Sequence, residues 1–193
     1  MPTIEKSKSA DAVSCAVVRN AGPSETVNGG GVFHIQCFDK DGALKWEEQS
    51  HNLVVNEGLD DMNTKYFTAS GYTAAWYLGL ISGASPTIAA ADTLASHAGW
   101  TEVPVSTGYT GNRKAVTFGG ATTADPSVIS NSGSASQFAM LGTYTVSGAF
   151  LCSVATGTSG ILFSASEFSA PGDRSVVSGD TLNVTYTFNL AAS

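Results

Sequence analysis

The segment from Thr181 to Leu190 alternates strictly between apolar and polar side chains. Its polar members are all threonine or asparagine, and its apolar members are Leu182, Val184, Tyr186, Phe188 and Leu190. Because successive side chains of a β-strand point to opposite faces, this pattern predicts a strand with one face on a core and the other in water. The hydroxyls and amides of the wet face cannot transfer protons near neutral pH, so we expect this strand to be scaffold.

The same scarcity of ionisable groups runs through the whole chain. Charged residues make up 13% of it and hydrophobic residues 42%, whereas the usual charged share is about 25%. The polar surface must therefore come from serine, threonine, asparagine and glycine, which suits β-sheets and packed assemblies. At 193 residues the chain fits one sizeable domain, or one domain with an arm.

Charge and cysteine content exclude several classes of function. The net charge of −7 disfavours a nucleic-acid-binding face, which needs clustered lysine and arginine. No apolar run approaches the roughly 20 residues that span a bilayer, and Lys6 and Lys8 are not followed by an apolar signal region. We therefore expect a soluble protein made in a reducing cytoplasm. Cys15, Cys37 and Cys152 lie far apart, so we expect buried thiols, with no zinc site, disulfide framework or cofactor.

The chain divides into an arm and a domain. Residues 1–31 are weakly periodic and end in the stretch Asn28–Gly31, which predicts a flexible joint. Within the arm, Ala12–Arg19 is compatible with a short strand, and equally with a segment that becomes ordered only against a partner. We place the domain at residues 32–193.

The domain opens with the pattern of a β-hairpin. Phe33, Ile35 and Cys37 alternate with polar residues, the stretch Asp39–Gly42 has the composition of a turn, and Leu44 and Trp46 resume the alternation. The next element is predicted to be a short helix capped by Asn56. Its expected apolar face consists of Leu59, Met62 and Tyr66.

Further short strands follow, separated by turns rich in glycine and serine. One of them, within 74–81, has apolar residues on both faces and is predicted to be central and buried. The others are expected at 114–118, 137–141, 143–153 and 161–164, and the region 86–100 is predicted to be an ordered loop. This organisation predicts an all-β fold, an antiparallel β-sandwich of jelly-roll or immunoglobulin-like topology with one short helix and an N-terminal arm.

Few residues are candidates for chemistry. His34, His51 and His97 are the side chains that ordinarily titrate near neutral pH, but none has a nucleophile or orienting carboxylate at a familiar catalytic spacing. The pairs Glu47-Glu48 and Asp60-Asp61 are adjacent in sequence, which is not the opposed geometry that glycoside hydrolysis needs. Asp39 and Asp41 are expected to form a turn, since the loop is too short for an EF-hand calcium site. We therefore expect a protein without enzymatic activity.

Aromatic residues offer candidate contact surfaces. Trp46 and Trp76 fall in strand patterns and are expected in the core. Trp100 and Tyr109 flank a loop rich in proline, glycine and threonine, and His97 lies beside Trp100 and close to Glu102. We expect Trp100, Tyr109 and His97 to contact a partner.

Several blocks of the sequence resemble a family of small structural proteins of tailed bacteriophages. The most distinctive are Asn-Leu-Val-Val-Asn-Glu-Gly and His-Ala-Gly-Trp-Thr-Glu, and the blocks in order are 51–59, 76–81, 95–102, 148–151 and 179–186. The likeness covers residues 32–190 and leaves the arm outside it. Members of this group serve as capsid cement, head fibre bases or tail components, and the resemblance carries no catalytic residues.

The resemblance implies a capsid decoration, or cement, protein on the surface of the virion, present in the host cytoplasm during assembly. Its expected partners are the major capsid protein and further copies of itself, as a dimer or trimer, with no nucleic acid and no membrane. Contacts are expected from residues 1–31 and from the long loops. The alternative is a tail or fibre component that binds a host surface glycan through Trp100 and Tyr109.

Overall fold

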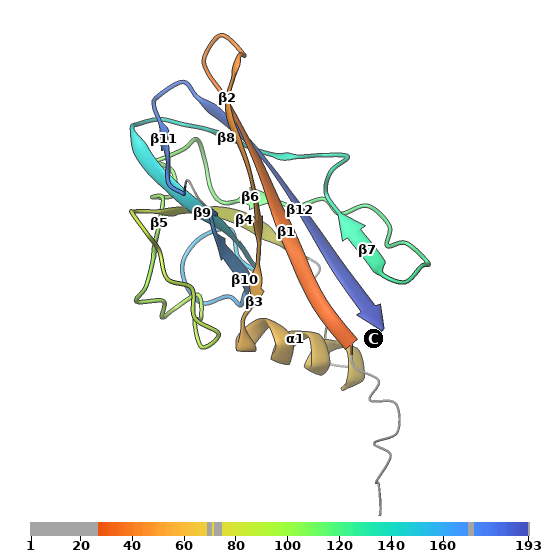
Figure 1. The fold of residues 1–193 in the computed structure, drawn as a ribbon. Helices are drawn as coiled ribbons and strands as arrows, with labels where there is room; N and C mark the ends of the chain where they lie inside the picture. The colour runs from red at the N-terminus through yellow and green to blue at the C-terminus, as the bar shows by residue number, and fades with distance from the viewer. Residues whose placement is uncertain (1–26, 69–70, 72–74, 170–171, 193) are drawn as a thin grey trace, which may run out of the picture.

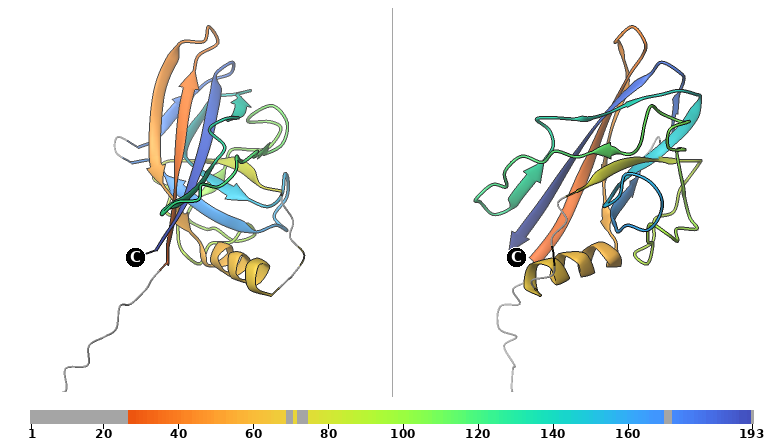
Figure 2. Two further views of the ribbon diagram at one scale, coloured as in Figure 1. Left: turned by 90° about the vertical axis from the view of Figure 1, so that its right-hand side faces the viewer. Right: turned by 180° about the vertical axis from the view of Figure 1, so that it is seen from behind.

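The computed structural model describes residues 27–68, 71, 75–169 and 172–192. It consists mostly of antiparallel strands in two facing sheets, with one α-helix, and so confirms the predicted all-β, sandwich-like fold (Figure 1). Helix α1 lies at one end of the sandwich, and the turn between the first two strands lies at the other end (Figures 1 and 2). The predicted arm lies largely outside the described residues.

The first sheet is built around the strand predicted at Thr181–Leu190. This strand, β12 (Thr181–Ala192), pairs on one side with β1 (Val27–Phe38), which in turn pairs with β2 (Leu44–His51). On its other side it pairs with the two short strands β7 (Ser127–Ser130) and β8 (Ser136–Ala139). Its inward side chains are buried, as the alternation predicts.

Strand β1 begins earlier than predicted. It runs from Val27, and its register with β12 is continuous from Val27 opposite Ala192 to Phe38 opposite Thr181. The stretch Asn28–Gly31 is therefore strand, and the prediction of a flexible joint there was wrong. The glycines serve packing instead: a Cβ atom on Gly31 would lie 2.8 Å from the Tyr186 hydroxyl. Residues 27–31 thus belong to the first sheet rather than to the predicted arm.

The second sheet has β9 (Tyr144–Cys152) at its centre, with β10 (Leu162–Glu167) and β4 (Tyr77–Ser82) on either side. Beyond β10 lies β3 (Leu53–Val54), and beyond β4 lie β5 (Thr101–Glu102) and β6 (Lys114–Ala115), while β11 (Arg174–Val176) pairs with the start of β9. Strand β4 is buried at its centre, as predicted.

The core has two parts. The larger part lies between the sheets and includes Phe33, Ile35, Leu80 and Val184. The smaller part includes Phe150 of β9, together with Val55, Ile81, Leu94, Trp100 and Leu162. The loop between β4 and β5 supplies Leu94 and Trp100 to this second cluster. Strand β9 therefore contributes to both clusters, which explains why it is buried from Val146 to Cys152.

Helix α1 (Asn56–Phe67) packs on the sandwich differently from the prediction. Asn56 is its first residue rather than a capping residue, because Val55 occupies the cap position without a side-chain cap. The helix approaches β10 through Gly58, where a Cβ atom would lie 2.3 Å from the Phe163 carbonyl oxygen. In addition, Glu57 accepts a hydrogen bond from the Leu162 N–H at 2.8 Å.

The predicted apolar face of α1 is largely exposed. Leu59 is 47% and Tyr66 83% exposed, and of the three predicted residues Met62 packs against the larger core cluster. An apolar helix face ordinarily packs on a core, but Leu59 and Tyr66 remain open to solvent. The physical reason is the close approach at Gly58, which turns a different side of the helix toward β10.

Candidate functional site

The structure buries two of the three residues predicted to contact a partner. Trp100 is 5% exposed, and its indole N–H donates to the Asp92 carboxylate at 3.0 Å. Tyr109 is fully buried, with its ring against Phe138 at a centroid distance of 4.9 Å. Burial, and then the charge of Glu102, raises the pKa of the Tyr109 hydroxyl. Both rings are core residues of the chain, which corrects the prediction that they form a contact surface.

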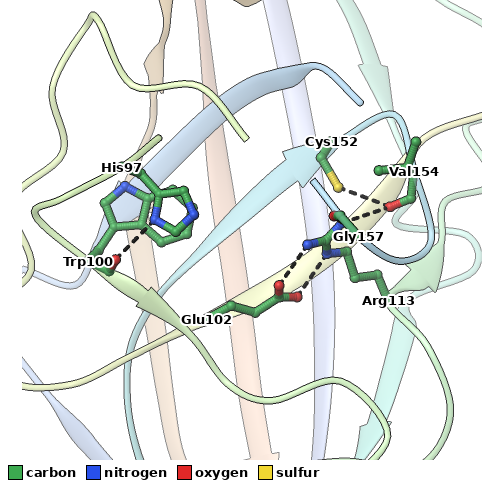
Figure 3. A network of polar contacts seen from close by, with 7 residues as sticks. All are labelled: His97, Trp100, Glu102, Arg113, Cys152, Val154 and Gly157. Carbon is green, nitrogen blue, oxygen red and sulfur yellow. Dashed lines mark hydrogen bonds and ion pairs between the residues drawn. The ribbon is translucent and has the colours of Figure 1, made fainter. Parts of the chain in front are cut away.

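His97 is partly exposed and is occupied by a structural role. Its ring stacks on Trp100 with centroids 3.8 Å apart and 16° between the planes (Figure 3). Its Nδ1–H donates to the Trp100 carbonyl oxygen at 3.0 Å. The imidazole therefore covers the indole and closes the loop, as a core-supporting histidine does.

A buried ion pair, which the sequence analysis did not anticipate, lies near Tyr109. Arg113 donates to both carboxylate oxygens of Glu102, at 2.8 and 2.7 Å, and also to the carbonyl oxygens of Val154 and Gly157 (Figure 3). Burial opposes the charge of the guanidinium, but the hydrogen bond to Glu102 and the Coulombic effect of neighbouring groups together outweigh it, so the pKa of Arg113 is raised. The pair ties the loop after β9 to strand β5. In the sequence, the indication of this ion pair was the presence of an arginine in a chain with few charged residues.

The described thiols are poor nucleophiles. Cys37 and Cys152 are buried and free. Burial is the main reason why the pKa of each thiol rises to about 11. At neutral pH both are therefore protonated, and the thiolate is the reactive form of cysteine. Cys15 lies outside the described residues.

Other ionisable groups hold the fold in place. Asp39 accepts the N–H groups of Asp41 and Ala43, each at 2.9 Å, and these bonds lower the pKa of its carboxyl group. Glu47 pairs with the ring of His34 across β1 and β2. Within the described parts of the chain, no three histidine, cysteine, aspartate or glutamate side chains gather in a way that would hold a metal ion. The described helix, α1, is too short and too polar to cross a membrane.

An apolar groove of about 860 Å³ lies beside α1. The helix contributes Met62, Tyr66 and Phe67 to one wall, and the end of β12 contributes Phe188 and Leu190 to the opposite wall. The remaining apolar lining comes from both sheets and their connections, namely Val27, Trp76, Phe118, Ile129, Leu151, Phe163 and Tyr186. We call this feature the α1 groove.

Two polar groups of the α1 groove, the Tyr186 hydroxyl and the Lys65 ammonium, have protein partners. The Tyr186 hydroxyl accepts a hydrogen bond from the Asn52 amide at 2.8 Å and one from the Ser164 hydroxyl at 3.3 Å. Burial raises the pKa of the Tyr186 hydroxyl, so it stays neutral. At the rim, the Lys65 ammonium donates to the Gly71 carbonyl oxygen at 2.8 Å. The groove is therefore suited to apolar side chains rather than to a charged substrate.

Three large apolar residues at this groove are unusually exposed. Tyr66, Phe67 and Val27 have 83, 77 and 75% of their surface open to solvent, more than the other exposed large hydrophobic residues among those described. Sequence reasoning missed the groove because it grouped Met62 and Tyr66 with Leu59 as one helix face, whereas the groove joins them to residues that are distant in the sequence. One signal was present: Tyr66 and Phe67 are adjacent large apolar residues, and neighbouring helix residues point in directions about 100° apart, so one helix–core contact does not bury both.

Comparisons with protein-family models, with curated proteins and with solved structures found no match to this chain.

Proposed function

We propose that this chain is a structural protein of a tailed-bacteriophage virion, a capsid decoration protein that binds the outside of the major capsid shell and stabilises it. The observation that carries the proposal is the exposed apolar end of the sandwich around α1, where Val27, Leu59, Tyr66 and Phe67 meet solvent. Exposed apolar surface of this kind is typical of a region that another protein covers. The sequence blocks that resemble virion proteins suggest which assembly that is.

The character of the described sandwich supports a structural role over a catalytic one. Its buried thiols have raised pKa values, and its buried ion pair is saturated with hydrogen bonds. The partners that we propose are the major capsid protein and neighbouring copies of the chain. Stabilisation would come from apolar surface that is buried only in the assembled shell, because the free energy gained by this burial favours the assembled state alone.

A matched pair of variants tests the α1 end as the attachment surface. Leu59 and Leu44 are similarly exposed, at 47 and 51%, but Leu44 begins β2 at the end of the sandwich remote from α1 (Figure 1). We expect Leu59→Asp to bind shells lacking the native protein about tenfold more weakly, because it places a charge in an apolar contact. Leu44→Asp should bind as the native chain does. Equal binding by both variants would exclude this surface.

The number of copies per virion tests the location. A decoration protein follows the symmetry of the shell, so quantitative mass spectrometry of purified virions should count on the order of hundreds of copies. A count of about a dozen or fewer would favour the tail or fibre alternative. That alternative has lost its proposed glycan contacts, because Trp100 and Tyr109 are buried.

A further inference from the structure

We propose that the α1 groove is the docking site for the chain's own segment Ala12–Val18, which lies outside the described residues. The groove is apolar and open, and the described chain begins at its rim with Val27. The proposal concerns the free protein and does not depend on the virion function proposed above. The segment would cover groove residues that also belong to the proposed attachment surface, so binding to a shell would displace it.

The segment has the chemistry that the groove requires. Ala12–Val18 is the apolar stretch of residues 1–26, and it is bounded by Asp11 and Arg19. In an extended conformation, Val13, Cys15 and Val17 share one face. That face presents apolar side chains to a groove whose buried Tyr186 hydroxyl already has two partners, so docking would not leave that hydroxyl unpaired.

The lengths are compatible. An extended segment from Val13 to Val17 spans about 13 Å, and a twelve-residue helix such as α1 is about 18 Å long. The segment can therefore lie along the helix without protruding far beyond either end.

The connection to the described chain favours docking within one molecule. Residues 19–26 separate the segment from Val27 and reach about 26 Å when extended. They include Gly22-Pro23, a pair typical of turns, which would let the chain reverse direction beside the groove. A short tether also gives the segment a high effective concentration at its own groove, so a second copy competes poorly in dilute solution.

A disulfide-trapping experiment on the full chain tests the docking. Asn63 is exposed and lies at the groove, so Asn63→Cys offers a partner to the native Cys15 without removing an apolar side chain. Cys37 and Cys152 are buried and should not compete. On mild oxidation of dilute protein with diamide, we expect a monomeric product whose peptide map links residue 63 to Cys15.

Two controls bracket that result. Asp41→Cys places a thiol on the exposed turn at the far end of the sandwich and should give no link to Cys15 (Figure 1). Asn63→Cys combined with Cys15→Ser should also remain unlinked. A disulfide-linked dimer with Asn63→Cys would overturn docking within one molecule in favour of a neighbouring copy's segment. No more linkage than in Asp41→Cys would overturn occupancy of the groove by this segment.

A second test uses an apolar dye whose fluorescence rises in hydrophobic grooves. The full-chain variant Val13→Asp/Val17→Asp should release the segment and raise dye fluorescence several-fold. Ser7→Asp/Ser9→Asp adds the same charge outside the apolar stretch and should behave as the native chain does. Equal fluorescence from both double variants would contradict the proposal. Neither measurement involves a virion, so the proposal can fail without affecting the proposed function, and the reverse also holds.

Discussion

Gly30 and Gly31 are neighbours in β1, but a side chain would meet different surroundings at each. A Cβ atom on Gly30 would have no other heavy atom nearby, whereas one on Gly31 would lie 2.8 Å from both the Thr187 carbonyl oxygen and the Tyr186 hydroxyl. Tyr186 is fixed by Asn52, whose side-chain oxygen accepts the Gly31 N–H at 2.6 Å. Gly31 is therefore required by close packing between β1 and β12.

This contrast gives a prediction for stability. Gly31→Ala should lower the free energy of unfolding by about 1–3 kcal/mol, because the added methyl group overpacks the site. Gly30→Ala should change it by less than about 1 kcal/mol. Urea denaturation of the two variants measures the difference. If both substitutions had the same small effect, residues 28–31 would behave as a flexible joint and their place in β1 would be in doubt.

The elements that connect the strands contribute as much to the core as some strands do. The loop between β4 and β5 places Leu94 and Trp100 in the second core cluster, with Phe150 of β9. The loop after β9 is held by Arg113, which bonds to the carbonyl oxygens of Val154 and Gly157 while Glu102 neutralises it. Loss of that neutralising charge would leave a buried cation without a counter-ion.

We therefore predict that Glu102→Gln destabilises the protein by about 3 kcal/mol or more. The matched control is Glu47→Gln, whose carboxylate pairs with His34 at a solvent-exposed position and should matter little. Thermal unfolding followed by circular dichroism would compare the two variants with the native chain. A small effect of Glu102→Gln would show that water or backbone movement compensates for the lost ion pair.

At this scale the sequence predicted some elements and missed others for identifiable reasons. The strand at Thr181–Leu190 and the hairpin from Phe33 to Trp46 were predictable, because alternation directly reports a half-buried strand. Trp100 was assigned to a surface because its neighbours are typical of exposed loops. The error arose because that loop contributes to a core cluster, and local composition carries no information on such long-range packing.

The whole molecule depends on pairings between segments that are distant in the sequence. The α1 groove combines the helix with the ends of β1 and β12, with Ile129 of β7 and with Phe163 of β10. No local pattern predicts such a combination, because it exists only after the two sheets have formed and α1 has packed on β10 through Gly58. The alternation of apolar and polar residues along the strands could predict the class of fold. Predicting the α1 groove would have required knowledge of which strands pair and in which register.

The position of β12 in the first sheet has a consequence for how the chain folds. Strand β12 is the last described strand in the chain, but it lies between β1 and the pair β7 and β8. As the ribosome synthesises the chain, β1 and β2 therefore emerge long before β12, which is the second partner of β1. Until β12 arrives, one edge of β1 is unpaired and the side chains of Phe33 and Ile35 are uncovered. The first sheet cannot close until residues 181–192 have left the ribosome, so this sheet forms late and depends on slow pairing between segments that are distant in the sequence.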